Sequence, residues 1–186
     1  MIIGVDEVGR GCLAGPLLAA AVELDEDLII PGLRDSKKLS KSQRERLVPV
    51  VESHTLNIGV GWVWPEEINE IGLTESVRLA MKRAIDKLKI TDQIIIIDGN
   101  YNYLNHIIGS TCLIKADDKV SAVAAASVIA KVARDKYMYD IAKKYPGYLF
   151  ERNVGYGTKH HIAAIRNLGV TPIHRKSFSP IKEIMT

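Results

Sequence analysis

The sequence predicts an α/β fold in which helices cover a mixed central β-sheet. Short apolar runs typical of strands alternate with longer stretches whose apolar residues recur every three or four positions, and the first strands lie close enough in the chain for hairpin-like connections. The chain has 186 residues, of which 47% are hydrophobic and 25% are charged. This length and composition predict one globular domain spanning residues 1–186, and they exclude a disordered, collagen-like or coiled-coil protein.

Five segments have the apolar or alternating pattern of strands: residues 1–5, 17–24, 55–64, 94–97 and 111–114. Gly15 and Pro16 separate the first two segments, and Pro65 ends the third. The fourth segment consists of consecutive isoleucines, so neither of its faces is polar. Such a run is typical of a strand buried at the centre of a sheet.

Helices are predicted over residues 40–52, 74–89, 119–145 and 158–168. Ser40 is a candidate N-cap of the first helix. Pro65 suits the first position of a further helix, because two glutamates follow it in the first turn. Pro146 and Gly147 end the long third helix, whose alanine-rich side predicts close packing on the sheet, and Gly169 ends the last one.

Charge is distributed unevenly along the chain, although the net charge is only +3. Residues 1–114 carry 12 Lys and Arg against 16 Asp and Glu, whereas residues 115–186 carry 13 against 6. A basic C-terminal third indicates a polyanionic partner, nucleic acid first, although a solvated basic helix has the same composition.

Neither a membrane span nor a disulfide framework is expected. The longest uncharged run, Gly99 to Ile114, has 16 residues, whereas a span needs about 20. The N-terminus shows no secretory leader, and Cys12 and Cys112 are too few for a disulfide framework. We therefore expect a cytoplasmic protein with two reduced thiols. The lack of an obvious exposed apolar stripe favours a monomer.

Carboxylates recur where predicted strands end. Asp6 and Glu7 follow the first strand, Asp98 follows the isoleucine run, and Asp117 follows the strand at residues 111–114. The carboxyl ends of strands bind ligands in open α/β sheets, and neighbouring strands lie about 4.8 Å apart. Two carboxylates about 4 Å apart repel each other by about 4 kcal/mol at an effective dielectric constant of about 20. Bound cations or protons must therefore compensate their negative charge.

Oxygen ligands without clustered Cys or His favour Mg²⁺ or Mn²⁺, and a pair of such ions is the usual apparatus for hydrolysing phosphodiesters. The strand-end acids therefore predict a site for two divalent ions. Each acid also has a local alternative: Asp98 with Gly99 suits a turn, and Asp118 suits a helix N-cap. Recurrence at three strand ends favours the metal site.

Several glycines and cations and one tyrosine are candidates for contact with a nucleic acid. The Gly9-Arg10-Gly11 segment follows an acidic pair and lets the backbone approach a ligand closely. Tyr156 lies in a glycine-flanked loop, where its ring can stack on a base or sugar. Each candidate also has an ordinary interpretation as a solvated turn, a surface residue or a core residue. The candidate substrate contacts are Gly9, Arg10, Gly11, Lys37, Lys38, Lys131, Tyr156, Thr158, Lys159 and Arg175.

Seven short motifs occur in order along nearly the whole chain. They are Gly4-Val5-Asp6-Glu7-Val8-Gly9-Arg10-Gly11, Asp35-Ser36-Lys37-Lys38-Leu39-Ser40, Ile97-Asp98-Gly99-Asn100, Lys115-Ala116-Asp117, Ala125-Ala126-Ser127-Val128-Ile129-Ala130-Lys131-Val132, Gly155-Tyr156-Gly157-Thr158-Lys159 and Arg175-Lys176-Ser177-Phe178. In these motifs the chain resembles ribonuclease HII, the bacterial type 2 ribonuclease H. Each motif alone is a weak signature, whereas seven in order form a strong one.

The resemblance implies a ribonuclease-H-like fold and a metal-dependent endonuclease. Such an enzyme cuts the RNA strand of RNA–DNA hybrids and also cuts at ribonucleotides embedded in duplex DNA, leaving 5′-phosphate and 3′-hydroxyl ends. The family's Gly-Arg-Gly backbone reads a ribose 2′-hydroxyl and its tyrosine stacks on the following sugar, roles that fall here to Gly9-Arg10-Gly11 and Tyr156. The resemblance also implies a four-carboxylate metal site, made here by Asp6, Glu7, Asp98 and Asp117.

The chain departs from the family pattern at a few positions. Cys12 stands where the family often has Pro, and Ala116 stands where it commonly has Gly. A second acid, Asp118, follows Asp117, so the identity of the fourth ligand is open, although alignment on Lys115 favours Asp117.

Two other classes of function are compatible with the same residues. A phosphatase or phosphotransferase would use Asp6 as a covalent nucleophile and would not cut hybrids. A non-enzymatic nucleic-acid binder would use the basic C-terminal third and would show steep salt dependence and no metal requirement.

Overall fold

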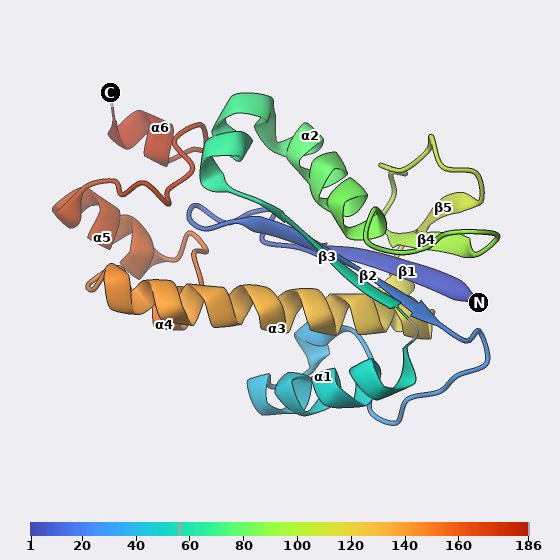
Figure 1. Ribbon diagram of the computed structural model, residues 1–186. Helices are drawn as coiled ribbons and strands as arrows, with labels where there is room; N and C mark the ends of the chain where they lie inside the picture. Colours follow the sequence, from blue (N-terminus) through green and yellow to red (C-terminus); the bar gives the residue numbers. More distant parts are fainter. Residues whose placement is uncertain (56, 186) are drawn as a thin grey trace.

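The computed structural model describes residues 1–55 and 57–185, and it contains a mixed five-stranded sheet with helices on both faces (Figure 1). β1, β2 and β3 pair antiparallel, whereas β4 runs parallel to both β1 and β5. The predicted mixed sheet is confirmed, with the isoleucine strand β4 inside it. In sheet order the strands are β3 (Asn57–Val63), β2 (Leu17–Leu24), β1 (Ile2–Val8), β4 (Ile94–Asp98) and β5 (Ser110–Leu113).

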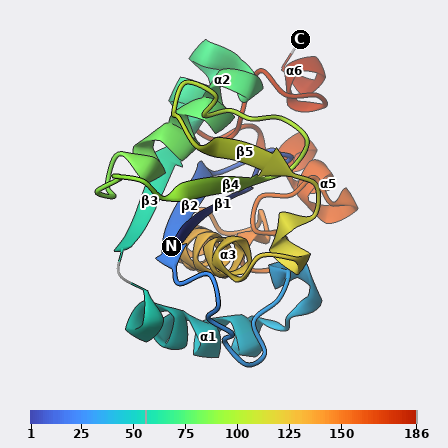
Figure 2. The ribbon, with the colours of Figure 1, turned by 90° about the vertical axis from the view of Figure 1, so that its right-hand side faces the viewer.

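Helices pack on both sides of this sheet. α2 (Pro65–Ile85) covers one face and α3 (Ser121–Lys144) covers the other, with α1 (Lys41–His54) packed against α3 (Figures 1 and 2). Ser40 caps α1 as predicted, because its hydroxyl accepts a hydrogen bond from the Gln43 backbone N at 3.3 Å. The shorter elements are the 3₁₀ turns η1 (Ser36–Lys38) and η2 (Ala116–Asp118) and the helices α4 (Phe150–Asn153), α5 (Lys159–Leu168) and α6 (Ile181–Ile184).

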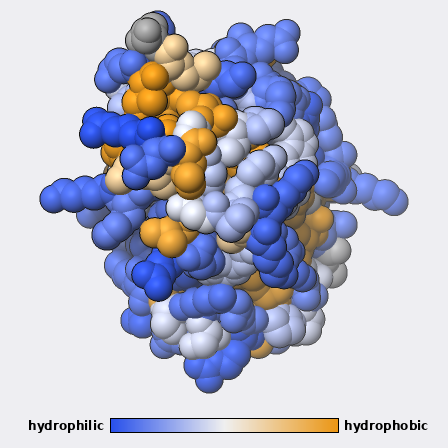
Figure 3. Space-filling view, turned by 90° about the vertical axis from the view of Figure 1, so that its left-hand side faces the viewer, coloured by the Kyte–Doolittle hydropathy of each residue, from blue (hydrophilic) through white to orange (hydrophobic). Residues whose placement is uncertain are grey.

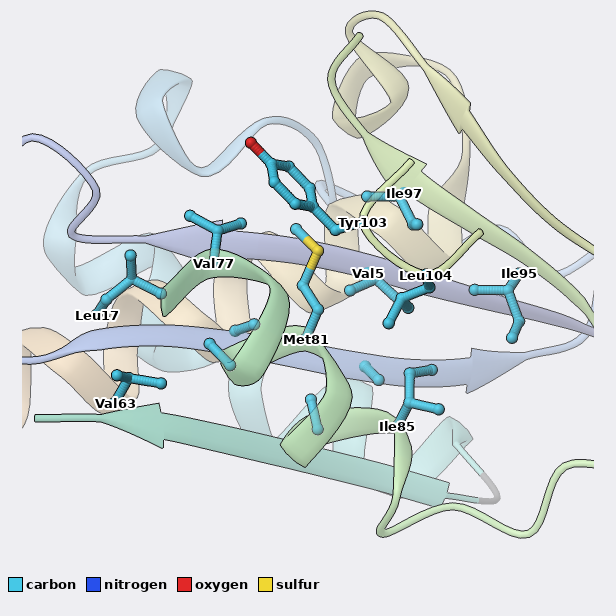
Figure 4. Close-up of a cluster of buried hydrophobic side chains, with 14 of the residues drawn as sticks. Val5, Leu17, Val63, Val77, Met81, Ile85, Ile95, Ile97, Tyr103 and Leu104 are labelled. Atoms are coloured by element: carbon cyan, nitrogen blue, oxygen red, sulfur yellow. The ribbon is translucent and has the colours of Figure 1, made fainter. Parts of the chain in front are cut away.

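The core between the sheet and α2 joins the two strands on which the site is built (Figure 4). Val5 of β1, Ile97 of β4 and Met81 of α2 are all fully buried there. Burying a side chain of this size stabilises a fold by about 1.5–3 kcal/mol. Val5 also pairs with Ile97 in parallel register, so the residues that follow them emerge at the same end of the sheet.

α3 approaches β1 closely because β1 has a glycine beneath the helix. A Cβ atom at Gly4 would overlap the backbone of Ala122 and Val123. Ala125 and Ala126 on the same helix are fully buried, which confirms the close packing expected from the alanine-rich side. This contact fixes the position of the later turns of α3, which carry polar residues toward the end of β1.

The C-terminal segments form a third cluster of buried apolar residues, which includes Phe150, Ile165 and Ile181. These segments lie at the left of Figure 1, near the α4, α5 and α6 labels. Figure 3 shows that side of the molecule, where hydrophobic residues gather in the upper part of a mostly hydrophilic surface. None of the helices within the described residues has the length and hydropathy that a membrane crossing requires.

One strand is longer than predicted. β1 continues to Val8, because its ladder with β2 extends through the pair Val8 and Leu18. Asp6 and Glu7 therefore lie inside the strand, near its end, rather than after it. Asp98 is the last residue of β4.

Two further predictions change in detail. The two helices expected from Pro65 and over residues 74–89 lie end to end as α2, on either side of a non-helical kink at Gly72 (φ 76°), and the second ends at Ile85. The predicted strand over residues 55–64 begins at Asn57 in the structure. Thr55 is the C-cap of α1, and residue 56 lies outside the described residues.

Candidate active site

Two parallel strands place three of the predicted carboxylates around one cavity. Because Val5 pairs with Ile97, Asp6 and Asp98 follow on adjacent strands. Asp6, Glu7 and Asp98 line one cavity of about 320 Å³. Asp6 is 6% exposed. Acids far apart in the sequence therefore face a shared opening at one end of the sheet.

Asp117 borders an adjoining cavity of about 560 Å³. It lies in η2, just beyond β5, and the two cavities share Asp98 and Lys37. Asp98 also anchors η2, since its Oδ1 accepts a hydrogen bond from the backbone N of Ala116 at 2.8 Å. All four predicted carboxylates thus border this pair of cavities.

Burial and mutual repulsion raise the pKa of three of these acids. The pKa of Asp6 lies well above its ordinary value because the carboxyl is desolvated and because Glu7 and Asp98 add negative charge. Burial raises the pKa of Glu7 as well, and Asp98 adds to the rise. Burial, Asp98 and Asp35 together raise the pKa of Asp117. A bound cation would offset both the desolvation and the repulsion.

Lys37 and Lys38 meet different acids. Lys37 Nζ lies 3.8 Å from Asp117 Oδ2, whereas Lys38 Nζ lies 2.6 Å from Asp118 Oδ1. Asp118 is exposed, and its hydrogen bond from Lys38 lowers its pKa. Asp117 is only 5% exposed. The charge of Asp118 is therefore already paired at the exposed rim, while Asp117 is buried near Asp98 and Asp35.

Asp35 is a further acid at this edge that is not among the sequence-predicted ligands. Carboxylate oxygens of Asp35, Asp117 and Asp118 all lie within 4.8 Å of one another, a spacing that can hold a metal ion. Asp35 also caps η1, because its Oδ1 accepts a hydrogen bond from the Lys37 backbone N at 2.8 Å. Its sequence signal is weak, because an Asp before a turn serves equally well as a cap.

Two buried serines link η1 to β1. The hydroxyls of Ser36 and Ser127 lie 2.8 Å apart, and Ser127 also hydrogen-bonds the carboxylate of Asp6. The turn that carries Lys37 is thus connected through α3 to the buried Asp6 of β1. Sequence patterns miss such a link, because a serine within a helix has no specific signature.

The Gly9-Arg10-Gly11 loop and Tyr156 form the other wall of the smaller cavity. Gly9 has φ 86°, a backbone conformation that disfavours other residues. An isolated backbone bridge pairs Cys12 with Tyr156 and so ties the loop to the tyrosine. Tyr156 is 39% exposed, and Lys131 Nζ lies 5.7 Å from the centre of its ring. The predicted loop, ring and amine therefore meet beside the carboxylates.

Known proteins that resemble this chain identify its family. The model of one family, described as ribonuclease HII, matches residues 3–181 of the chain. The chain belongs to the ribonuclease HII family. It is 48% identical over 184 residues to the ribonuclease HII of Bacillus mycoides and to that of Bacillus cereus, and each alignment covers 99% of this chain and 71% of the relative.

Solved structures of archaeal relatives confirm the ribonuclease-H-like fold. Ribonuclease H2 from Pyrococcus horikoshii has a TM-score of 0.84 at 29% identity, with 98% of this chain and 96% of that chain covered. Ribonuclease HII from Archaeoglobus fulgidus, solved in complex with PCNA, has a TM-score of 0.83 at 28% identity, with 100% and 97% covered. Ribonuclease HII enzymes are metal-dependent endonucleases that act on RNA–DNA hybrids.

The donor set of this ribonuclease HII fits a hard divalent cation. Within the described part of the chain, neither carboxylate cavity is lined by a cysteine or a histidine. Carboxylate oxygens are the ligands that hard divalent cations prefer. Burial first, and neighbouring acids second, raise the pKa values of Asp6, Glu7 and Asp117, and a bound cation would offset both effects.

Three predicted substrate contacts have other surroundings. Arg175, predicted as a phosphate contact, is fully buried, and its Nε and Nη1 donate hydrogen bonds to the carbonyls of Gly15 and Arg10, each at 3.0 Å. It therefore supports the glycine loop from inside the protein. Thr158 caps α5 and borders a separate cavity of about 160 Å³, and Lys159 is exposed in the first turn of α5.

Proposed function

We propose that this ribonuclease HII hydrolyses the RNA strand of RNA–DNA hybrids and also cuts at single ribonucleotides embedded in duplex DNA, leaving 5′-phosphate and 3′-hydroxyl ends. One observation carries the proposal: acids from β1, β4 and η2 border the same pair of cavities as the Gly9-Arg10-Gly11 loop and Tyr156. A centre suited to phosphodiester hydrolysis thus lies beside an element suited to reading a ribose. We further propose that the enzyme acts as a monomer with two Mg²⁺ or Mn²⁺ ions.

Four carboxylates would hold the ions, and the chain keeps those carboxylates in place. When bound, such ions activate a water molecule as the nucleophile and stabilise the leaving 3′ oxygen. The backbone N–H of Ala116 orients Asp98, and the Ser127 hydroxyl orients Asp6. The proposed ligands are Asp6, Glu7, Asp98 and Asp117.

Discrimination between RNA and DNA would fall to the glycine loop and Tyr156. A Cβ atom at Gly11 would meet no other heavy atom within 4 Å, so the loop is open on the side where a ribose would approach. Only the 2′-hydroxyl distinguishes a ribose from a deoxyribose at such a site. Burial and the neighbouring Cys12 raise the pKa of Tyr156 to about 12, so its phenol stays neutral while the ring stacks on a sugar.

Lysines around the cavities would contact the phosphates. Lys37 lines both cavities, Lys38 lines the larger one, and Lys131 lines the smaller one. Lys131 is held in position by an ion pair with Asp135, at 2.9 Å from Nζ to Oδ1. Thr158 and Lys159 lie farther along the same loop and helix and remain candidates for contacts with a longer duplex.

Cleavage of a defined duplex tests the proposal. A labelled DNA duplex with one ribonucleotide and a continuous RNA–DNA hybrid are incubated with the protein, with and without Mg²⁺, and the cut ends are mapped. We expect metal-dependent cleavage of both, with a 3′-hydroxyl on one product and a 5′-phosphate on the other. Asp98→Asn should keep its far-ultraviolet circular dichroism and lose cleavage, because the loss of one carboxylate charge weakens the ion site.

Other results would point to other functions. A folded, active Asp98→Asn protein would refute the metal mechanism. Hybrid binding that falls steeply with salt, without cleavage and without a metal requirement, would indicate a binding protein. A phosphorylated Asp6 trapped with a small phosphate ester would indicate a phosphotransferase.

A further inference from the structure

Two buried histidines behind Tyr156 form a hydrogen-bonded pair that the proposed cleavage reaction does not use. His161 of α5 and His174 are both fully buried, and their Nε2 atoms lie 3.2 Å apart. The rings of Phe150 and Tyr148 pack against them, with ring centroids 5.2 Å from His161 and from His174, respectively. Neither histidine lines either of the two cavities that the predicted carboxylates border.

The neighbours of the pair decide which ring nitrogen carries each proton. The backbone N–H of Thr171 can only donate, and it lies 2.9 Å from His174 Nδ1. The carbonyl of Tyr156 can only accept, and it lies 2.9 Å from His161 Nδ1. His174 therefore carries its proton on Nε2 and His161 on Nδ1, so His174 donates to His161. A directed chain of hydrogen bonds runs from Thr171 through both rings to the backbone of Tyr156.

Two backbone bridges join this series of hydrogen bonds to the segment that follows the Gly9-Arg10-Gly11 loop. Cys12 pairs with Tyr156, and Ala14 pairs with His174, in isolated antiparallel bridges. The segment from Cys12 to Ala14 directly follows Gly9-Arg10-Gly11. The histidine pair thus connects the backbone segments at Tyr156 and His174, which both pair with residues 12–14.

Both imidazole rings are uncharged at neutral pH, because their surroundings lower their pKa values. Burial lowers the pKa of His161, and burial together with His161 lowers the pKa of His174 to about 4. At neutral pH both nitrogens that face each other therefore share a single proton. A second proton there would place two N–H groups against each other and break the chain.

We propose that the His161–His174 pair is a positioning device that sets the spacing between the Gly9-Arg10-Gly11 loop and Tyr156, and thereby the enzyme's preference for a single ribonucleotide in DNA. The inference rests on the proposed function, in which these two elements read the ribose. Since the pair contacts the backbone of Tyr156 and lines neither carboxylate cavity, its removal affects recognition and spares the cleavage centre.

Two substitutions of His161 separate positioning from space filling. In His161→Asn the amide N–H stands near the former Nδ1 and can still donate to the Tyr156 carbonyl. In His161→Gln the amide lies farther out, near the former Nε2, and the bond to Tyr156 is lost. Glutamine is closer to histidine in volume, so a space-filling role predicts that glutamine is the milder change. The positioning role predicts the reverse.

The readout is the ratio of kcat/KM for a duplex with one ribonucleotide to kcat/KM for a continuous RNA–DNA hybrid. We expect His161→Gln to lower this ratio by about ten- to a hundredfold while hybrid cleavage is retained, because misplacement by about 1 Å can cost that much. His161→Asn keeps the donor to the Tyr156 carbonyl but no longer reaches His174, so it should lower the ratio by less than His161→Gln does. His160→Gln, which removes an exposed imidazole from the same helix, is the matched control and should not change it.

Several outcomes would overturn the inference. A wild-type ratio in His161→Gln would do so, and so would an equal loss on both substrates, which would mean that the pair serves only the fold. If His161→Gln fails to fold, His174→Gln, which keeps an N–H near Nε2, is compared with His174→Asn, which does not; equal ratios would overturn the inference. A wild-type protein that leaves single ribonucleotides uncut would refute the proposed specificity itself, and this inference with it, before any variant is made.

Discussion

Replacement of His174 should change how the stability of the protein depends on pH. His174 is fully buried, and burial together with His161 lowers its pKa from 6.5 to about 4. Between these two values the unfolded chain binds a proton that the folded protein does not. The stability contributed by the neutral ring is therefore complete above pH 6.5 and is lost progressively as the pH falls toward 4.

The size of this effect follows from the two pKa values. At about 1.4 kcal/mol per pKa unit, their difference corresponds to about 3 kcal/mol. Domains are typically stable by about 5–15 kcal/mol, so the loss is measurable. Asp6, Glu7 and Asp117 act in the opposite direction in the metal-free protein, because their raised pKa values let the folded state bind protons. The three acids contribute equally to wild type and to a His174 variant, so their contribution cancels when the two free energies of unfolding are subtracted.

Urea unfolding of metal-free protein between pH 7 and pH 4, followed by circular dichroism, provides the test. His174→Gln should be less stable than wild type at pH 7, and the gap should narrow by about 3 kcal/mol as the pH approaches 4. His160→Gln, which removes an exposed ring, should give a curve parallel to that of wild type. A gap between wild type and His174→Gln that stays constant from pH 7 to pH 4 would refute the reasoning.

Four further substitutions test the site and its scaffold. Asp117→Asn should reduce cleavage at least about a hundredfold. Asp118→Asn should stay within a few-fold of wild type in the same assay, because Lys38 already pairs with the Asp118 carboxylate. Equal losses in the two variants would contradict the assignment of Asp117 as the ligand. Gly4→Ala should lower the free energy of unfolding by about 1–3 kcal/mol in urea, because its methyl group would push α3 off β1. Arg134→Met should lower it by about 3 kcal/mol or more, because three buried carbonyls would lose their donor, and an unchanged urea midpoint would argue against that role.

Much of the scaffold could be predicted because the relevant patterns are local. The isoleucine run predicted that β4 lies inside the sheet, although Ile94 is 51% exposed, and the alanine-rich stretch predicted a helix lying close on the sheet. The length of β1 was underestimated, because polar residues such as Asp6 interrupt the apolar pattern while backbone pairing with β2 continues. The non-helical backbone at Gly72 separates the two helical segments that the sequence predicted within α2.

By itself, the sequence determined the mixed sheet, most helix positions and the acids that meet at the ends of β1 and β4, because hydrophobic periodicity and strand ends are properties of short segments. Only the tertiary structure buried Asp117 while leaving Asp118 exposed beside Lys38, turned Arg175 inward and joined His161 to His174. Those outcomes depend on burial and on hydrogen-bond partners that distant parts of the chain supply only once it has folded.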